Sequence, residues 1–252
     1  MLELDLDLPP GVLLDPPAPD LGQLAARHGA IWFTATQPHC VVDGGRVVEI
    51  AAFGADITAR PVDGNTLNCR HSVAGGSPSL AMTARMACGF SADLGAVGPC
   101  LGLFVIFSAP DSPARTLVAV SAEGSRDYLY LSHDDGTLFL GRRNGNAVAS
   151  VPAPAAAQRP ILALARIDSA GLAVSVDGGP PVSVPDAEAV LEGDVTTFIG
   201  CRRQREGLYK TLGAGHIYDA GFLPSIDPFS DDLAPLRQAL IARVKGLGAD
   251  GV

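Results

Sequence analysis

Short apolar runs, each closed by glycine, proline, asparagine or aspartate, follow one another from residue 31 to residue 224. The run Leu172–Val176 alternates large apolar side chains with Ala173 and Ser175, which predicts a strand with one packed face. Turn signals such as Asn144-Gly145 join neighbouring runs, because both residues tolerate positive φ. Runs about ten residues apart, joined by tight turns, predict an all-β fold built as a two-sheet antiparallel sandwich.

The segments predicted as strands share this short length and apolar character. In chain order they are Ile31–Thr36, Arg46–Phe53, Leu80–Cys88, Leu101–Phe107, Thr116–Ser121, Tyr128–Ser132, Thr137–Arg142, a new strand after Asn144-Gly145, Ile161–Ile167, Leu172–Val176, Val182–Val184, Thr196–Cys201 and Ala214–Ala220.

The C-terminal part of the chain has a helical period instead. Ser230 is a good N-cap residue, and two aspartates follow it at the positive end of the expected helix dipole. An apolar stripe then recurs at helical spacing. The stripe consists of Leu233, Leu236, Leu240 and Val244. We therefore predict one helix near residues 230–245.

Residues 1–29 differ from the rest of the chain, because they are rich in proline and acidic residues. The alternating segment LELDLDL and the prolines after it predict an extended arm, with a short helical turn near Leu21–Arg27. Alternating leucines left in water are unfavourable. We therefore expect the arm to pack on another subunit of a homo-oligomer or on another particle protein. Residues 30–252 form the predicted folded domain.

Charge and composition exclude several classes. Hydrophobic residues make up 47% of the chain and charged residues 18%, which predicts a well-buried core. The net charge of −9 argues against nucleic-acid binding. The five cysteines form no C-x-x-C pair and are expected to be reduced. The chain opens without a signal-like segment and has no apolar run of about 20 residues, so we expect a soluble cytoplasmic product without a membrane span.

The order of motifs between residues 101 and 224 resembles the concanavalin A-like lectin/glucanase superfamily, in its laminin G-like branch. The motifs are LGLFVIF, DDGTLFLGRR, LAVSVDGG, TTFIG and GAGHIYDAGFLP. The segment IWFTATQPHCVVDGGRVVEIAAFGADITARP is similar to the opening strands of bacterial and phage members. Pro160 and Ile161 stand where members often carry Trp. The resemblance implies a jelly-roll sandwich, a fold shared by lectins, adhesion modules, glycoside hydrolases and virion proteins, so it does not by itself fix a function.

Catalytic motifs are weak in this sequence. The hydrolase branch of the superfamily carries two carboxylates on one strand, in the pattern E-x-D-x-x-E or E-x-D-x-E. The nearest match, at Glu192 and Asp194, lacks the last glutamate. The sequence has neither a G-x-S-x-G elbow nor an H-E-x-x-H motif. We therefore predict that the chain is not an enzyme.

Candidate ligand-binding residues combine aromatic rings with arginines, a set suited to stacking on sugars and pairing with carboxylates. They are Tyr128, Tyr130, Arg142, Arg143, Arg202, Arg203, Arg205 and Tyr209. Tyr128 and Tyr130 share one face of the predicted strand Tyr128–Ser132. The alternative is a solvated basic edge that pairs with the chain's own acidic residues.

Calcium occurs in many lectin-type and laminin G-like members, so the resemblance implies a cation site. Asp127, Asp134 and Asp135 flank one hairpin and offer carboxylate ligands. The alternative is that these are turn aspartates that make local hydrogen bonds. No other cofactor is predicted.

These observations predict a non-catalytic recognition or adhesion module that binds a polysaccharide or surface glycan. A virion or virion-like particle, such as a phage or gene-transfer-like particle with this chain in its head or tail fibre, is the predicted context. Two alternatives stay open: a purely structural virion or assembly protein, and a glycoside hydrolase of the same superfamily.

Overall fold

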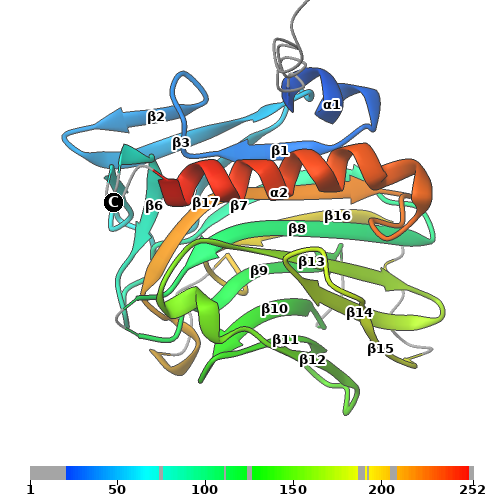
Figure 1. The fold of residues 1–252 in the computed structure, drawn as a ribbon. Coiled ribbons are helices and arrows are strands. Elements are labelled where there is room, and N and C mark those ends of the chain that lie inside the picture. Colours follow the sequence, from blue (N-terminus) through cyan, green and yellow to red (C-terminus); the bar gives the residue numbers. More distant parts are fainter. Residues whose placement is uncertain are drawn as a thin grey trace, which may run out of the picture.

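Two antiparallel β-sheets pack face to face in the computed structural model (Figure 1). The structure describes residues 21–73, 76–110, 112–123, 127–186, 191, 193–204 and 209–249. This architecture confirms the predicted all-β sandwich with one C-terminal helix.

Sheet A has the strand order β15–β14–β13–β8–β17–β1–β3–β2, and β5 and β6 join it beside β3 and β17. Its strands are β1 (Ile31–Thr34), β2 (Cys40–Asp43), β3 (Arg46–Phe53), β5 (Arg70–Ser72), β6 (Ser79–Met82), β8 (Cys100–Ser108), β13 (Ile161–Asp168), β14 (Gly171–Val176), β15 (Val182–Val184) and β17 (Gly215–Pro224).

Sheet B has the order β4–β7–β16–β9–β10–β11–β12. Its strands are β4 (Thr58–Pro61), β7 (Phe90–Ala96), β9 (Arg115–Ala122), β10 (Leu129–Asp134), β11 (Thr137–Arg142), β12 (Val148–Pro152) and β16 (Asp194–Ile199). Strand β4 also pairs with β3, so it links the two sheets.

The central strands of sheet A are buried on both faces. In β8, Leu103, Val105 and Phe107 point into the core between the sheets. Phe104 and Ile106 point to the opposite side, into a second cluster beneath the C-terminal helix. This double burial explains why the sequence of β8 is a continuous apolar run rather than an alternating one.

Helix α2 (Ala234–Ala249) covers the outer face of sheet A (Figure 1). The predicted apolar stripe is confirmed, since all four of its members are buried in the cluster beneath the helix. The helix starts later than predicted, after a 3₁₀ turn at Asp231–Leu233. Ser230 does not cap it through its side chain, because its hydroxyl donates to the Asp227 carbonyl oxygen. No helix of the described residues is long and apolar enough to cross a membrane.

A buried carboxylate ties α2 to the sheet. Asp219 in β17 has 2% of its side chain exposed. Its Oδ1 accepts a hydrogen bond from the indole Nε1 of Trp32 at 3.1 Å, and its Oδ2 pairs with Nε of Arg243 at 3.1 Å. Trp32 is therefore a core residue. Arg243 also donates to the Thr36 hydroxyl, so one helix side chain connects three elements of the fold.

Helix α1 (Leu21–Arg27) lies where the sequence predicts a short helical turn. Leu24 and Ala25 are buried in the same cluster as α2, so this segment is part of the folded body. The predicted arm therefore contributes to the body from residue 21 onward. Residues 1–20, which carry the LELDLDL segment, lie outside the described residues.

All five cysteines are free, and four of them are buried. Burial raises the pKa of Cys40 to about 11 and the pKa of Cys201 to about 12. Thiols in such surroundings stay protonated and unreactive at neutral pH. The expectation of reduced thiols agrees with this arrangement.

We expect Arg243→Ala to lower the free energy of unfolding by about 3 kcal/mol, because it leaves the Asp219 carboxylate buried without its cation. Adding Asp219→Asn should restore part of this loss, since the amide carries no charge. Guanidinium denaturation measures both effects. Arg60→Ala is the matched control, because Arg60 is 76% exposed and its pair with Glu49 is a weak surface contact. An equal loss in both arginine variants would contradict this account.

Candidate binding site on the outer face of sheet B

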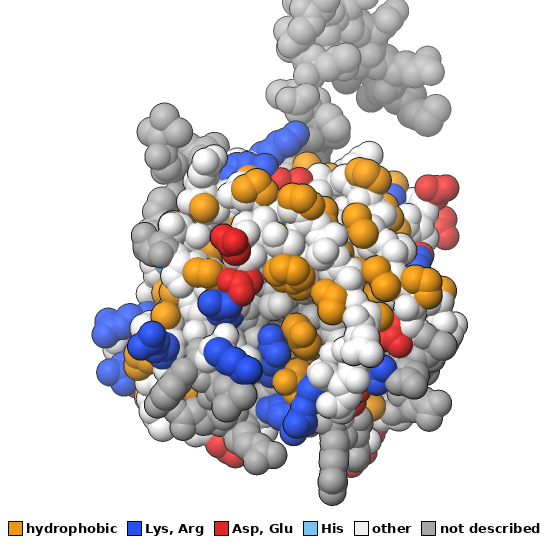
Figure 2. All heavy atoms as spheres, turned by 90° about the horizontal axis from the view of Figure 1, so that it is seen from below, with side chains coloured by type: hydrophobic (Ala, Val, Ile, Leu, Met, Phe, Trp, Pro, Cys, Tyr) orange, Lys and Arg blue, Asp and Glu red, His pale blue; other side chains and the backbone are white. Residues whose placement is uncertain are grey.

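A cavity of about 500 Å³ opens on sheet B. Its lining combines aromatic, hydroxyl and charged side chains. The lining residues are Arg115, Tyr130, Ser132, His133, Asp134, Phe139, Val148, Ser150, Arg202 and Lys210. Figure 2 views the molecule from below Figure 1, where β11 and β12 lie lowest. On this face Lys and Arg side chains gather at the left and centre of the lower half.

Strand alternation builds the floor of the cavity. Ser132, Phe139 and Ser150 stand opposite one another across β10, β11 and β12. Their chain neighbours Leu138 and Leu140 point the other way, into the core. The sheet thus presents a row of hydroxyl groups and an aromatic ring on the face that the core does not use.

The guanidinium of Arg202 lies over the ring of Tyr130. Its Cζ is 3.8 Å from the centre of the Tyr130 ring, which is cation–π geometry. Its Nε donates to the Thr116 hydroxyl at 3.0 Å, and that hydroxyl donates to the Thr211 carbonyl oxygen. Arg202 has no acidic partner among the described residues. Its remaining N–H groups are left for a ligand or for water.

Two more cations and one carboxylate stand at the rim. Arg115 forms an ion pair with Asp134 across the ends of β9 and β10. Lys210 lies on the 3₁₀ turn Tyr209–Thr211, which a bridge between Arg115 and Leu212 holds beside β9. Three cations therefore face one carboxylate among the described lining residues, and the cavity is locally positive in an acidic protein.

The aromatic and basic surface continues beside the cavity. The ring of Tyr128 lies 6.0 Å from the ring of Tyr130. Cζ of Arg203 lies 5.0 Å from the centre of the Tyr128 ring, and Cζ of Arg143 lies 5.8 Å from it. Guanidinium groups and phenol rings thus form one continuous strip together with Arg202.

The structure brings together five of the predicted ligand residues: Tyr128, Tyr130, Arg143, Arg202 and Arg203. Arg142 is different. Its side chain is 15% exposed and forms ion pairs with Asp127 at 3.0 Å and with Asp186 at 3.4 Å, so it holds the fold together. Arg205 and the side chain of Tyr209 lie outside the described residues.

The three aspartates proposed for calcium do not converge. Asp127 precedes β10, while Asp134 and Asp135 lie at its far end, and the strand between them, Leu129–Asp134, is about 17 Å long. Asp127 accepts hydrogen bonds from the backbone N–H groups of Tyr128 and Asn144. No group of three His, Cys, Asp or Glu among the described residues is arranged to hold a metal ion. These contacts give Asp127 a local turn role.

Sequence reasoning missed the remaining lining residues. Phe139 and Ser150 alternate with buried residues in their strands, so the period of two does contain the signal that they share a face. Arg115 and Lys210 have no such signal. They meet only because two segments about a hundred residues apart pair in space.

The sequence matches no protein-family model, and the search of curated proteins finds no relative. Solved structures with a similar fold include a GH54 α-L-arabinofuranosidase, with 12% identity and a TM-score of 0.53 over 79% of this chain and 51% of that chain. They also include the sialidase of Trypanosoma rangeli in complex with sialic acid, with 13% identity and a TM-score of 0.53 over 87% of this chain. This chain spans about half of the arabinofuranosidase and a third of the sialidase.

Domains LG4-5 of the mouse laminin α1 chain are also similar, with 16% identity and a TM-score of 0.42 over 75% of this chain and 46% of that chain. The similarity to the arabinofuranosidase and to the sialidase shows the β-sandwich fold. The laminin G-like branch and the bacterial or phage type stay predictions from the sequence.

The comparisons correct one prediction. The sequence indicated that the chain is not an enzyme, because its strands lack the paired-carboxylate motif. That prediction is wrong, because the arabinofuranosidase and the sialidase, which have a similar fold, are glycoside hydrolases. A carboxylate motif on one strand is one way to build a hydrolytic centre, and its absence does not exclude the others.

His133, which lines the cavity, should make the folding stability of the protein depend on pH. Its ring packs 5.4 Å from that of Phe107, and burial lowers its pKa below the usual 6.5. The unfolded chain therefore binds a proton more readily than the folded chain as the pH falls below about 6.5, so stability should decrease there. His133→Gln should flatten this decrease in denaturation curves recorded between pH 5 and pH 8. His28→Gln should keep the wild-type slope; unchanged slopes in both variants would refute the assignment.

Proposed function

We propose that this chain binds an anionic glycan in the cavity on the outer face of sheet B. The observation that carries the proposal is the guanidinium of Arg202, stacked at 3.8 Å on Tyr130 above a hydroxyl-lined floor and without an acidic partner among the described residues. Sugar recognition needs a flat apolar surface, hydrogen-bonding groups and, for an acidic sugar, a fixed cation. The cavity offers all three.

The chemistry of each wall fits a carboxylated sugar. The ring of Phe139 offers a contact to the C–H face of a pyranose, while the ring of Tyr130 carries the Arg202 guanidinium. The hydroxyls of Ser132 and Ser150 offer hydrogen bonds to the sugar hydroxyls. Arg202 and Lys210 then face the carboxylate. A cavity of about 500 Å³ lies within the usual range for small-molecule sites. The Trypanosoma rangeli sialidase is similar in fold and was solved with sialic acid, a carboxylated sugar, which supports this ligand class.

The proposal also concerns the assembly that presents this domain. We expect this domain to be presented by a phage or gene-transfer-like particle, with residues 1–19 contacting a neighbouring subunit. The reason for expecting this contact is the alternating leucine pattern of the LELDLDL segment. Deleting residues 1–19 should then weaken assembly, measured by sedimentation, and leave the unfolding curve of the domain unchanged. Loss of the folded domain on this deletion would contradict the expected role.

The binding proposal predicts that Arg202→Gln combined with Lys210→Gln weakens binding to polygalacturonate or sialylated glycans about tenfold or more, because two charge-assisted contacts are lost. The salt dependence of binding should decrease in parallel. Calorimetry at two salt concentrations measures both quantities. The control is Arg46→Gln, an exposed arginine at the start of β3 in sheet A. Equal binding of neutral dextran and of the acidic glycans would refute the anionic ligand class.

Hydrolysis of the bound glycan is the second candidate function, favoured by the likeness to the arabinofuranosidase and the sialidase. Asp134 is the carboxylate among the described lining residues, and it is paired with Arg115. If the cavity is a hydrolytic centre, reducing sugar should be released from an acidic polysaccharide, and Asp134→Asn should reduce that release at least a hundredfold. Release that survives Asp134→Asn would place the chemistry elsewhere, and absence of release would leave binding as the function.

A further inference from the structure

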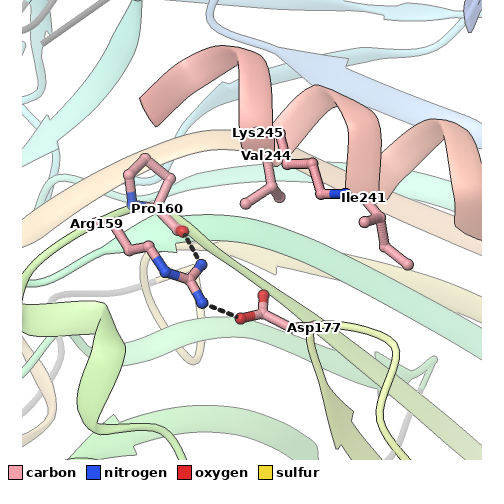
Figure 3. Close-up of a pocket in the computed structure, with 6 residues that line it drawn as sticks. All are labelled: Arg159, Pro160, Asp177, Ile241, Val244 and Lys245. Atoms are coloured by element: carbon pink, nitrogen blue, oxygen red, sulfur yellow. Dashed lines mark hydrogen bonds and ion pairs between the residues drawn. The ribbon is translucent and has the colours of Figure 1, made fainter. Parts of the chain in front are cut away.

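A second cavity, of about 330 Å³, lies on the other side of the sandwich, between α2 and the adjoining ends of β13 and β14 (Figure 3). Its lining residues define what we name the helix pocket: Arg159, Pro160, Asp177, Ile241, Val244 and Lys245. The volume is at the lower end of the range for small-molecule sites. The proposed glycan site does not use this cavity, because it lies on the outer face of sheet B.

Two well-packed elements form the apolar walls of the helix pocket. Ile241 and Val244 come from α2, and Pro160 directly precedes β13 (Figure 3). Gly178 sits at a φ of +74°, and a Cβ there would lie 2.7 Å from Cδ1 of Ile241. The glycine therefore lets Ile241 lie directly against the turn after β14. Because Val244 belongs to the buried cluster under the helix, this wall is held in place before any ligand arrives.

The polar end of the pocket is fixed by Asp177. Its Oδ1 accepts the backbone N–H of Leu162 at 2.9 Å, and its Oδ2 pairs with Nη2 of Arg159 at 2.6 Å. Arg159 also donates from Nη1 to the Pro160 carbonyl oxygen at 2.9 Å (Figure 3). The guanidinium is thereby oriented, and it keeps further N–H donors that these contacts do not use.

Lys245 supplies a second cation, on the flexible side chain typical of lysine. It is exposed, and no acidic side chain among the described residues pairs with it. Lys245 and Arg159 together exceed Asp177 by one positive charge, so the lining carries a net charge of about +1. The chain has two lysines in all, Lys210 and Lys245, and each lines one of the two cavities.

We infer that the helix pocket binds a small amphipathic anion. An apolar body packs against Ile241, Val244 and Pro160, and a single carboxylate or sulfonate group lies between Lys245 and Arg159. One negative charge balances the lining, and the apolar walls disfavour a fully polar ligand such as a free sugar. The glycan site and the helix pocket lie on opposite sides of the sandwich, so both can be filled at once.

The test uses two probes with the same aromatic body. 8-Anilinonaphthalene-1-sulfonate carries one sulfonate, and N-phenyl-1-naphthylamine lacks it. We expect saturable binding of the sulfonate at one site on the full chain, at least tenfold tighter than binding of the neutral probe, measured by fluorescence titration. Lys245→Glu should weaken the sulfonate at least tenfold and leave the neutral probe nearly unchanged. Ile241→Asn should weaken both probes, because it makes an apolar wall polar.

Lys210→Glu is the matched control, since it makes the same charge change at the other cavity. It should leave sulfonate binding unchanged. The two lysines also allow a direct map by acetic anhydride labelling and mass spectrometry. The sulfonate should protect Lys245 from acetylation and leave Lys210 reactive, whereas an acidic glycan should do the reverse.

Protection of Lys210 by the sulfonate, equal affinity for the two probes, or sulfonate binding that survives Lys245→Glu would each overturn the inference. Unfolding curves of each variant show whether a loss of binding reflects a loss of fold. Failure of the glycan to protect Lys210 counts against the proposed function alone, because the two arms of the labelling experiment read different residues.

Discussion

The contact between helix α2 and the outer face of sheet A decides which surfaces this protein has available. Asp219 is buried in the middle of β17 and bonds to Trp32 of β1 and to Arg243 of α2, so sheet and helix are joined through one carboxylate. The helix then covers apolar side chains such as Phe104 and Ile106, which a bare sheet would expose. With one sheet covered in this way, sheet B keeps an outer face on which polar residues alternate with core residues. The larger of the two cavities opens on that face.

The cavity on sheet B is positively charged, whereas the whole chain is negatively charged. The protein carries a net charge of −9, yet the cavity gathers Arg115, Arg202 and Lys210 around a single carboxylate, Asp134. These cations come from β9, from the segment after β16 and from the turn before β17, so only the folded sandwich brings them together. Arg202 is held from below by Tyr130 and from the side by a threonine hydroxyl. Such prior ordering reduces the entropy that a ligand must remove when it binds.

Strand β11 could be predicted to the residue and β10 to within two residues, because the alternation of this hairpin and its Asp-Gly turn act over short distances. The predicted strand Leu80–Cys88 was too long. Strand β6 ends at Met82, and Arg85 adopts a positive φ of 66°, so an apolar composition there conceals a turn.

The binding site was harder to predict, because its side chains depend on partners far away in the sequence. Arg142 and Arg143 are neighbours in sequence, yet Arg142 pairs with Asp186, 44 residues away, while Arg143 lies near the Tyr128 ring. Pairings at such separations leave no local pattern.

The two cavities share one arrangement of charged residues. In each, an arginine is fixed by an aspartate at the end of a strand: Arg115 by Asp134, and Arg159 by Asp177. Each of these aspartates lies at a tight turn with a glycine one or two positions further on. In each cavity a lysine stands nearby as a second cation. A fixed guanidinium sets direction, whereas a flexible ammonium adjusts to the position of a bound anion. The aspartate neutralises one cation in each cavity. This leaves Lys245 in the helix pocket, and Arg202 together with Lys210 on sheet B, so each cavity retains positive charge that an anionic ligand would balance.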